Sequence, residues 1–168
     1  TLEVLKELAA RIEQRNKQIA ELGVRNLEAY NKKADTPMSQ IVLVIDECQM
    51  LFTERPDIIE RELRDILKLI VQQGRSQGVH LILATQTLMN SAIPIDGLQG
   101  AGLTDFYLFN CDSRDSEKLV KNSSPITGTL QTGEIYYHHN QNVSPDVQFQ
   151  SFQQRKPCRK HGCYWVGL

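Results

Sequence analysis

Residues 41–50 read IVLVIDECQM, in which five aliphatic residues run directly into two adjacent carboxylates. The aliphatic run does not alternate with polar residues, and this predicts a strand that is buried on both faces. A second apolar run, VHLILAT at residues 79–85, ends with Thr85 and is followed by Gln86. The two runs therefore predict two strands of one sheet that both end in polar residues.

The segment between these runs has the period of an amphipathic helix. From Pro56 onward, apolar residues at positions 59, 63, 66, 67 and 70 mark one face of that helix, and Gly74 and Gly78 bracket its end. A strand, a helix and a second strand within residues 41–85 predict a βαβ unit. The strands of such a unit are parallel and joined by a right-handed crossover.

The rest of the chain supplies further elements around this unit. We expect a domain over residues 1–152 and a basic tail with two cysteines over 153–168. The expected elements are a helix over 1–22 that ends before Gly23, a polar loop over 31–37, a loose stretch over 87–103, a strand over 105–110, a short helix over 114–121, a hairpin over 128–139 with Gly133 in its turn, and an edge strand within 147–152.

Composition restricts the classes of function. The chain has 168 residues, about one domain, and its 19 basic and 20 acidic residues give no overall basic field. Any contact with nucleic acid must therefore be local or built by assembly. The apolar runs are too short for a membrane span, and four cysteines are too few for a disulfide scaffold, which favours a reducing compartment. The opening TLEVLKELAA is no signal peptide, and its lack of Met suggests a piece of a longer protein.

The polar strand ends suggest a nucleotide site. Ligands of α/β sheets lie beyond the carboxyl ends of parallel strands, and an apolar strand ending in Asp-Glu is typical of a Walker B element. Asp46 would hold Mg²⁺ through water, and Glu47 would orient or deprotonate the water that attacks the γ-phosphate of ATP. Thr85 would contact the nucleotide, and Gln86 would sense its γ-phosphate.

The residues alone leave a second interpretation open, in which the acids are an ordinary polar strand end. The phosphate-binding pattern G-x-x-x-x-G-K-[ST] occurs nowhere in the sequence. Either that loop belongs to a part of the protein that precedes this chain, or the acids do not belong to a nucleotide site.

Several stretches in their family order resemble the FtsK/SpoIIIE-type motor ATPases. They are LGVRNLEAYN (22–31), IVLVIDECQMLF (41–52), QQGRSQGVHLILATQ (72–86), and CDSRDSEKLV (111–120) with TGEIYY (132–137). The resemblance covers roughly residues 8–137. It implies an α/β fold, a RecA-like P-loop NTPase core with a central, mainly parallel sheet flanked by helices, here without its Walker A part. It also implies ATP and Mg²⁺ as cofactors and assembly into a ring, usually a hexamer.

The resemblance implies roles for arginines as well. Arg15 in RIEQRN is the nearest match to an arginine that reaches the phosphate of the neighbouring subunit, with Arg11 second. Arg75 in QQGRSQG is another candidate. The alternatives are a solvated helix face for Arg15 and a favourable helix-dipole position for Arg75. The sequence departs from the family after ATQ, where translocases usually continue with Arg-Pro, and keeps Asp-Ser-Arg at 112–114.

These features predict an ATPase that translocates double-stranded DNA in chromosome segregation or conjugation, with residues 87–103 as a candidate region for DNA contact. One alternative is a type VII secretion ATPase that moves secreted proteins, and another is a degenerate interaction module that does not hydrolyse ATP. We expect the chain to be inactive alone because it lacks Walker A. We expect the full-length protein to be anchored in the bacterial membrane, with this domain on the cytoplasmic face.

Overall fold

The computed structural model describes residues 2–89, 91–120, 125–139, 148–151 and 164–167. Its helices are α1 (Leu2–Glu21), α2 (Leu27–Lys33), α3 (Asp57–Gln73), α4 (Ile95–Ala101) and α5 (Ser113–Leu119), with the 3-10 turns η1 (Cys48–Leu51), η2 (Arg75–Gln77) and η3 (Pro125–Thr129). Its strands are β1 (Ile41–Ile45), β2 (Val79–Thr85), β3 (Asp105–Leu108), β4 (Glu134–His139), β5 (Gln148–Ser151) and β6 (Tyr164–Gly167).

The βαβ unit forms as the sequence predicts. β1 and β2 pair in parallel, with Ile41 opposite Val79 and Ile45 opposite Leu83, and α3 connects them. Gly74 ends α3 where the chain turns back into β2. A Cβ atom at Gly74 would lie 2.4 Å from the carbonyl oxygen of Ile70 and 2.7 Å from that of Val79, so only glycine allows this close return.

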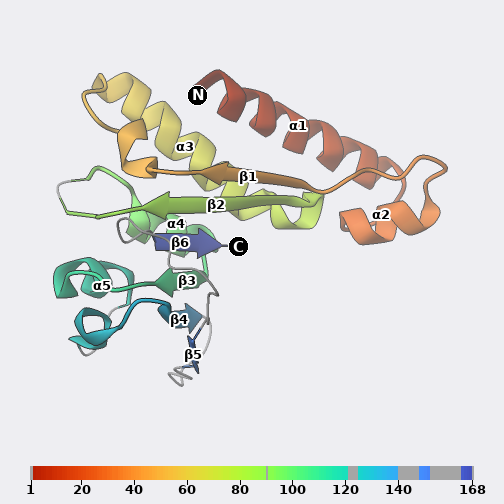
Figure 1. Ribbon diagram of the computed structural model, residues 1–168. Helices are drawn as coiled ribbons and strands as arrows, with labels where there is room; N and C mark the ends of the chain where they lie inside the picture. The colour runs from red at the N-terminus through yellow and green to blue at the C-terminus, as the bar shows by residue number, and fades with distance from the viewer. Residues whose placement is uncertain (1, 90, 121–124, 140–147, 152–163, 168) are drawn as a thin grey trace.

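The sheet has the order β1-β2-β6-β3-β4-β5. β6 is antiparallel to both β2 and β3, so β1, β2 and β3 run in the same direction. β4 is antiparallel to β3, and β5 is antiparallel to β4. The expected α/β class is confirmed, in a sheet of mixed direction. The carboxyl ends of β1, β2 and β3 lie at one edge of this sheet (Figure 1).

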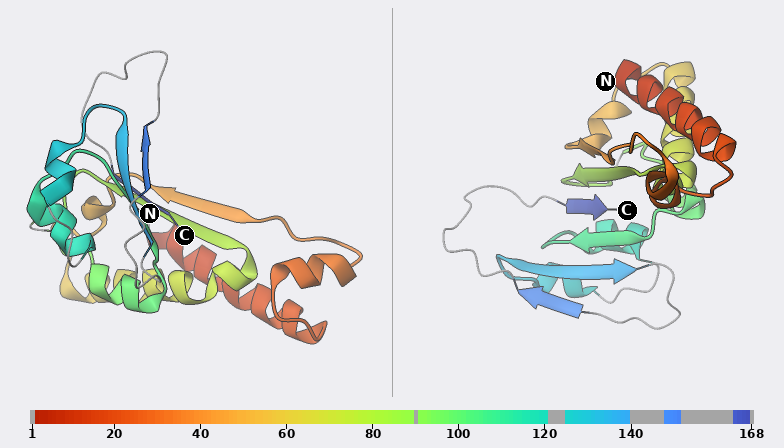
Figure 2. Two further views of the ribbon diagram at one scale, coloured as in Figure 1. Left: turned by 90° about the horizontal axis from the view of Figure 1, so that it is seen from below. Right: turned by 90° about the vertical axis from the view of Figure 1, so that its right-hand side faces the viewer.

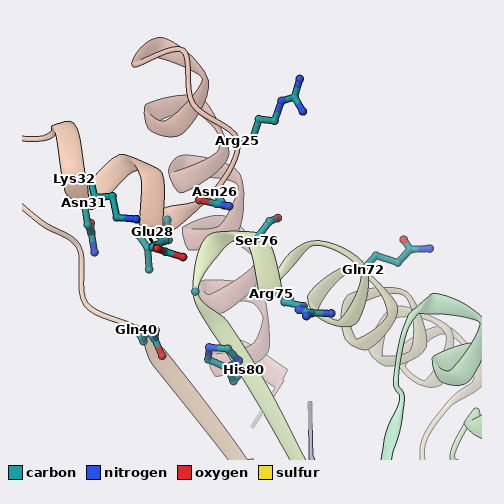
Figure 3. Close-up of a pocket in the computed structure, with 12 residues that line it drawn as sticks. Arg25, Asn26, Glu28, Asn31, Lys32, Gln40, Gln72, Arg75, Ser76 and His80 are labelled. Atoms are coloured by element: carbon teal, nitrogen blue, oxygen red, sulfur yellow. Dashed lines mark hydrogen bonds and ion pairs between the residues drawn. The ribbon is translucent and has the colours of Figure 1, made fainter. Parts of the chain in front are cut away.

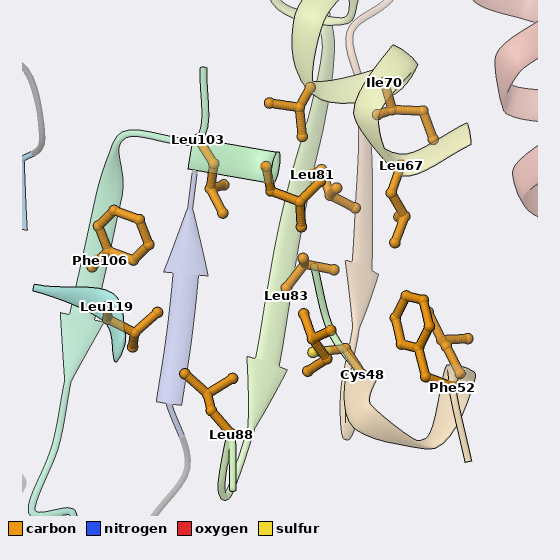
Figure 4. Close-up of a cluster of buried hydrophobic side chains, with 14 of the residues drawn as sticks. Cys48, Phe52, Leu67, Ile70, Leu81, Leu83, Leu88, Leu103, Phe106 and Leu119 are labelled. Atoms are coloured by element: carbon orange, nitrogen blue, oxygen red, sulfur yellow. The ribbon is translucent and has the colours of Figure 1, made fainter. Parts of the chain in front are cut away.

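One face of the sheet packs on α1, α3 and α4 (Figure 2). The buried core lies between them and brings together side chains from distant parts of the chain (Figure 4). Each large aliphatic side chain buried there contributes about 1.5–3 kcal/mol by leaving water. The core includes Ile12 from α1, Leu67 and Ile70 from α3, Leu81 and Leu83 from β2, Leu103, and Phe106 from β3.

The prediction that β1 is buried on both faces is wrong. Ile41, Leu43 and Ile45 pack against the core, but Val42 and Val44 on the opposite face are 57% and 48% exposed. The reason is that α1, α3 and α4 all lie on one side of the sheet (Figure 2). An apolar run without alternation shows that both faces of the strand carry apolar side chains, but it does not show that other elements cover both faces.

Two helices formed where the sequence suggested none. α2 includes residues 31–33 of the expected polar loop. The Asn26 side chain accepts a hydrogen bond from the Ala29 amide at 2.9 Å and so stabilises the start of this helix as its N-cap. An ion pair of 2.6 Å between Lys32 and Glu28 joins successive turns. α4 lies inside the stretch 87–103, where Gly and Pro obscured a one-sided helix that buries Leu98.

The expected hairpin over 128–139 is also wrong, because residues 125–129 form η3 and only β4 is a strand, paired with β3 and β5. Gly133 does lie in a turn, with φ 91°. The expected helix over 1–22, strand over 105–110, short helix over 114–121 and edge strand within 147–152 are confirmed as α1, β3, α5 and β5, although β3 ends at Leu108 and α5 at Leu119. Residues 153–163 and 168 of the predicted tail lie outside the described residues, and residues 164–167 form β6.

None of the helices in the described part of the chain combines the length and the apolar character that a membrane span requires.

Candidate functional site

The two acids lie directly beyond the carboxyl end of β1. Asp46 is exposed and Glu47 is half-buried. Oδ1 of Asp46 accepts a hydrogen bond from the backbone amide of Glu47 at 3.0 Å, which leaves Oδ2 free of any partner among the described residues. Glu47 has a left-handed backbone, with φ 50° and ψ 48°. A residue other than glycine costs about 1–3 kcal/mol in such a conformation, so the surrounding structure must hold it there.

The carboxylate of Glu47 bridges the two predicted strand ends. Nε2 of Gln86, which follows β2, donates a hydrogen bond to Oε1 of Glu47. Nε2 of Gln49, in η1, donates a second hydrogen bond to Oε2 at 2.6 Å. The structure therefore brings together Glu47 and Gln86, which are 39 positions apart in the sequence. Gln49 was not among the residues that the sequence singled out, because nothing in IDECQ distinguishes it from a surface amide.

Thr85 at the end of β2 is only 4% exposed. Its hydroxyl lies 2.5 Å from Oε1 of Gln49 and 2.8 Å from the carbonyl oxygen of Thr87. The side chain thus points into the polar cluster of Glu47, Gln49 and Gln86. A contact between Thr85 and a nucleotide stays a prediction.

The residues present fit a magnesium site of the water-rich kind. No group of three or more His, Cys, Asp or Glu side chains that could hold a metal occurs in the described ranges. Mg²⁺ needs no such cage, since it is commonly held by one or two carboxylates together with retained water and phosphate oxygens. The exposed Asp46 carboxylate, with Oδ2 available, suits that mode. The two cysteines of the predicted tail, Cys158 and Cys163, lie outside the described residues.

Cys48 follows the two acids in the sequence, and its side chain packs in the buried core (Figure 4). Burial raises the pKa of its thiol to about 12, and the nearby charges of Glu47 and Asp46 act in the same direction. The thiol stays protonated at neutral pH and serves as a small apolar side chain.

The loop that carries Gln86 is tied to α5. Asp115 is 5% exposed, and its Oδ1 accepts hydrogen bonds from the Leu88 amide at 2.9 Å and from the Thr87 hydroxyl at 3.2 Å. Nζ of Lys118 donates to the Leu88 carbonyl oxygen at 2.8 Å. The start of the stretch 87–103, the candidate region for DNA contact, is therefore held by buried polar contacts.

Arg15 lies at the other end of the sheet. Its guanidinium donates to the carbonyl oxygens of Gln77 and Ser39, each at 2.7 Å, and these residues precede β2 and β1. Burial lowers the pKa of Arg15, and the charge of Arg11 adds to this effect. The rise of about 3.3 Å per residue along β1 places Arg15 roughly 20 Å from Glu47 in the same chain.

Arg75 is exposed at the same end, in a cleft of about 860 Å³ that it shares with Arg25 and His80 (Figure 3). Lys32 also lines this cleft and is paired with Glu28. Neither the Arg75 nor the Arg25 guanidinium has a hydrogen bond or ion pair within the described ranges. The cleft thus presents two available cations at the amino ends of β1 and β2, away from Glu47.

The contacts of Arg15 predict a structural effect. We expect Arg15→Ala to lower the free energy of unfolding by about 1–3 kcal/mol, because the part-buried carbonyl oxygen of Gln77 and the exposed one of Ser39 both lose a charged donor. Arg11→Ala is the matched control on the same helix. Its ion pair with Glu7 is 2.7 Å long but exposed, so its loss should cost less than about 1 kcal/mol. Urea unfolding of the three proteins measures the difference, and equal costs would contradict the packing of Arg15.

No family model matches the chain. It is 28% identical over 165 residues to the protein named DNA translocase FtsK from Chlorobaculum tepidum, a match that covers 98% of this chain. Another protein of that name, from Pseudomonas syringae pv. tomato, is 28% identical over 154 residues and covers 76% of the chain. In both comparisons the chain spans 18% of the length of the relative.

A solved structure supports the same relationship at the level of the fold. The pCW3 conjugation coupling protein TcpA, in a monomer form with ATPγS, has a TM-score of 0.73 and 24% sequence identity. The match covers 90% of this chain and 43% of TcpA. EssC from Geobacillus thermodenitrificans, in a structure of its ATPases 2 and 3, has a TM-score of 0.59 and 18% identity, covering 99% of this chain and 26% of EssC.

The order of elements, the two polar strand ends that meet at Glu47 and the sequence matches all agree with one relationship. The chain is related to the FtsK/SpoIIIE-type motor ATPases.

Proposed function

We propose that the full-length protein is an ATP-driven motor that translocates double-stranded DNA, and that this chain carries its water-activating residues. The contact between Glu47 and Gln86 is the observation that carries this proposal, because it joins the ends of β1 and β2 at one site. The names of the relatives, DNA translocase and conjugation coupling protein, support DNA as the cargo.

Each residue of the site has a chemical task. The carboxylate of Glu47 accepts a proton from the attacking water, and the amide of Gln86 holds one carboxylate oxygen in place. Asp46 offers a free carboxylate oxygen for the hydration shell of Mg²⁺. Bound ATP would supply the phosphoryl group, and the Mg²⁺ bound with it would neutralise the charge of the phosphates.

The phosphate cradle must come from another part of the full-length protein. The pattern G-x-x-x-x-G-K-[ST] does not occur in this sequence. The chain alone therefore lacks the lysine and the backbone amides of that loop, which bind the β- and γ-phosphates. We therefore infer that the isolated chain does not hydrolyse ATP.

Arg75 is the better-placed candidate for acting in trans. Its exposed guanidinium has no partner in the described part of the chain, whereas Arg15 is held by two carbonyl oxygens. Arg75 lies at the amino ends of the parallel strands and Glu47 beyond their carboxyl ends. In a ring, the amino ends of the strands in one subunit can face the carboxyl ends of the strands in the next, so that Arg75 of one subunit lies near Glu47 of its neighbour.

We propose that the ring is a hexamer and that it is located at the cytoplasmic face of the membrane.

The cargo is tested with the full-length protein. Duplex DNA should stimulate its ATP hydrolysis several-fold at low salt, and the stimulation should fall steeply as the salt concentration rises, because phosphate contacts release counterions. Glu47→Gln is the control that should show no stimulated turnover.

A type VII secretion ATPase is the second candidate, and the likeness to EssC favours it only through the shared fold. An active enzyme with no response to duplex DNA at low salt would overturn the DNA-translocase proposal and leave protein export.

A further inference from the structure

We propose that Gln49 is a positioning residue that fixes the Glu47 carboxylate to the rigid end of β2 through Thr85. The inference rests on the proposed ATPase function of Glu47. Three contacts form the bridge: Thr85 Oγ1 to Gln49 Oε1 at 2.5 Å, Gln49 Nε2 to Glu47 Oε2 at 2.6 Å, and Gln86 Nε2 to Glu47 Oε1.

Hydrogen-bond chemistry allows one orientation of the Gln49 amide. An ionised carboxylate only accepts hydrogen bonds, so the NH₂ group of Gln49 must face Glu47. The carbonyl oxygen of Gln49 then faces Thr85, whose hydroxyl supplies a hydrogen. That hydroxyl has a single hydrogen, which it shares between Gln49 and the Thr87 carbonyl oxygen 2.8 Å away. The Gln49 amide therefore accepts a hydrogen bond from Thr85 through its oxygen and donates one to Glu47 through its nitrogen, so the hydrogen bonds run in one direction from Thr85 to Glu47.

The bridge supplies rigidity where Glu47 lacks it. Glu47 lies in the turn after β1 with a left-handed backbone, and its other partner, Gln86, is exposed. Thr85 is buried and belongs to β2, which pairs with β1 over residues 79–83 and places Thr85 opposite Tyr164 of β6. Gln49 thus connects the second carboxylate oxygen to the best-fixed part of the site.

The geometry leaves Glu47 able to react. Each carboxylate oxygen has two lone pairs, and each accepts one amide hydrogen here, so each can still accept a hydrogen bond from water. The Gln49 side chain contacts Glu47 and Thr85, so it acts through Glu47. Its loss should therefore reduce the rate of the chemical step and leave nucleotide affinity largely unchanged.

The test uses the full-length protein, its steady-state ATPase activity and two substitutions of the bridge. Gln49→Leu keeps the size of the side chain and removes the amide. We expect kcat to fall by about 10–100-fold, the usual cost of losing a group that orients a reactive one, with KM for ATP within about threefold of wild type. Gln14→Leu, an exposed glutamine on α1, is the matched control and should keep wild-type kcat.

Thr85 tests the direction of the bridge. Thr85→Ser keeps the hydroxyl and should keep kcat close to wild type, while Thr85→Val keeps the shape and should lower kcat in the same way as Gln49→Leu. The double variant Gln49→Leu with Thr85→Val should be no slower than Gln49→Leu alone, because both changes break one chain of contacts.

The outcomes separate this inference from the proposed function. The positioning role would be overturned by a wild-type kcat in Gln49→Leu or by fully additive losses in the double variant. In either case, an inactive Glu47→Gln enzyme would leave the ATPase proposal standing. Full activity in Glu47→Gln would overturn the ATPase proposal itself. If Gln49→Leu does not fold, equal kcat values in Thr85→Ser and Thr85→Val overturn the bridge.

Discussion

Glu47→Gln in the full-length protein should lower ATP turnover by at least about 100-fold, the lower range for loss of a positioned general base. The amide has nearly the size of the carboxylate but cannot accept a proton from water. It would also place an NH₂ group against the amide of Gln86 or Gln49, which now donate to the two carboxylate oxygens. ATP affinity should stay close to wild type because the phosphate-binding loop is unchanged.

Single-turnover hydrolysis and equilibrium binding of a fluorescent ATP analogue would measure the two quantities separately. Glu54→Gln is a close control. Like Glu47, Glu54 has a left-handed backbone, with φ 51°, but it is exposed, lies beyond η1 and has no hydrogen bond to Gln86 in the described residues. Its replacement should leave both quantities unchanged. Wild-type turnover by the Glu47→Gln enzyme would remove Glu47 from the mechanism.

Leu81→Ala should lower the free energy of unfolding of the chain by about 2–5 kcal/mol, the range for a leucine removed from a packed core. Leu81 has no exposed surface and faces the helices from the middle of β2. Val44→Ala is the control on the neighbouring strand. Its side chain is 48% exposed on the other face of the sheet, and its truncation should cost less than about 1 kcal/mol.

Urea unfolding of the 168-residue chain, followed by circular dichroism, would measure both costs. The comparison tests the one-sided packing of the sheet directly. A loss for Val44→Ala as large as that for Leu81→Ala would mean that the face bearing Val42 and Val44 is covered in solution, contrary to their exposure in this structure.

The βαβ unit could be predicted because each of its parts has a local cause. The apolar run before Asp46, the helical period after Pro56 and the second run before Gln86 each select an element. A helical crossover between the two strands makes them parallel, and chirality makes that crossover right-handed. α2 and α4 could not be predicted with the same ease, since a cap at Asn26 and a single buried Leu98 are weak local signals against a background of polar residues and glycine.

The sequence by itself determined that Asp46, Glu47 and Gln86 lie at strand ends, because an apolar run followed directly by polar residues is a local pattern of consecutive positions. It also carried the family resemblance. Only the tertiary structure decided that Gln49 and Thr85 bridge to Glu47, that Arg15 binds carbonyl oxygens at the opposite end of the sheet, and that one face of β1 is exposed. These features depend on which side chains meet across tens of residues and on where helices pack, and no local pattern encodes either.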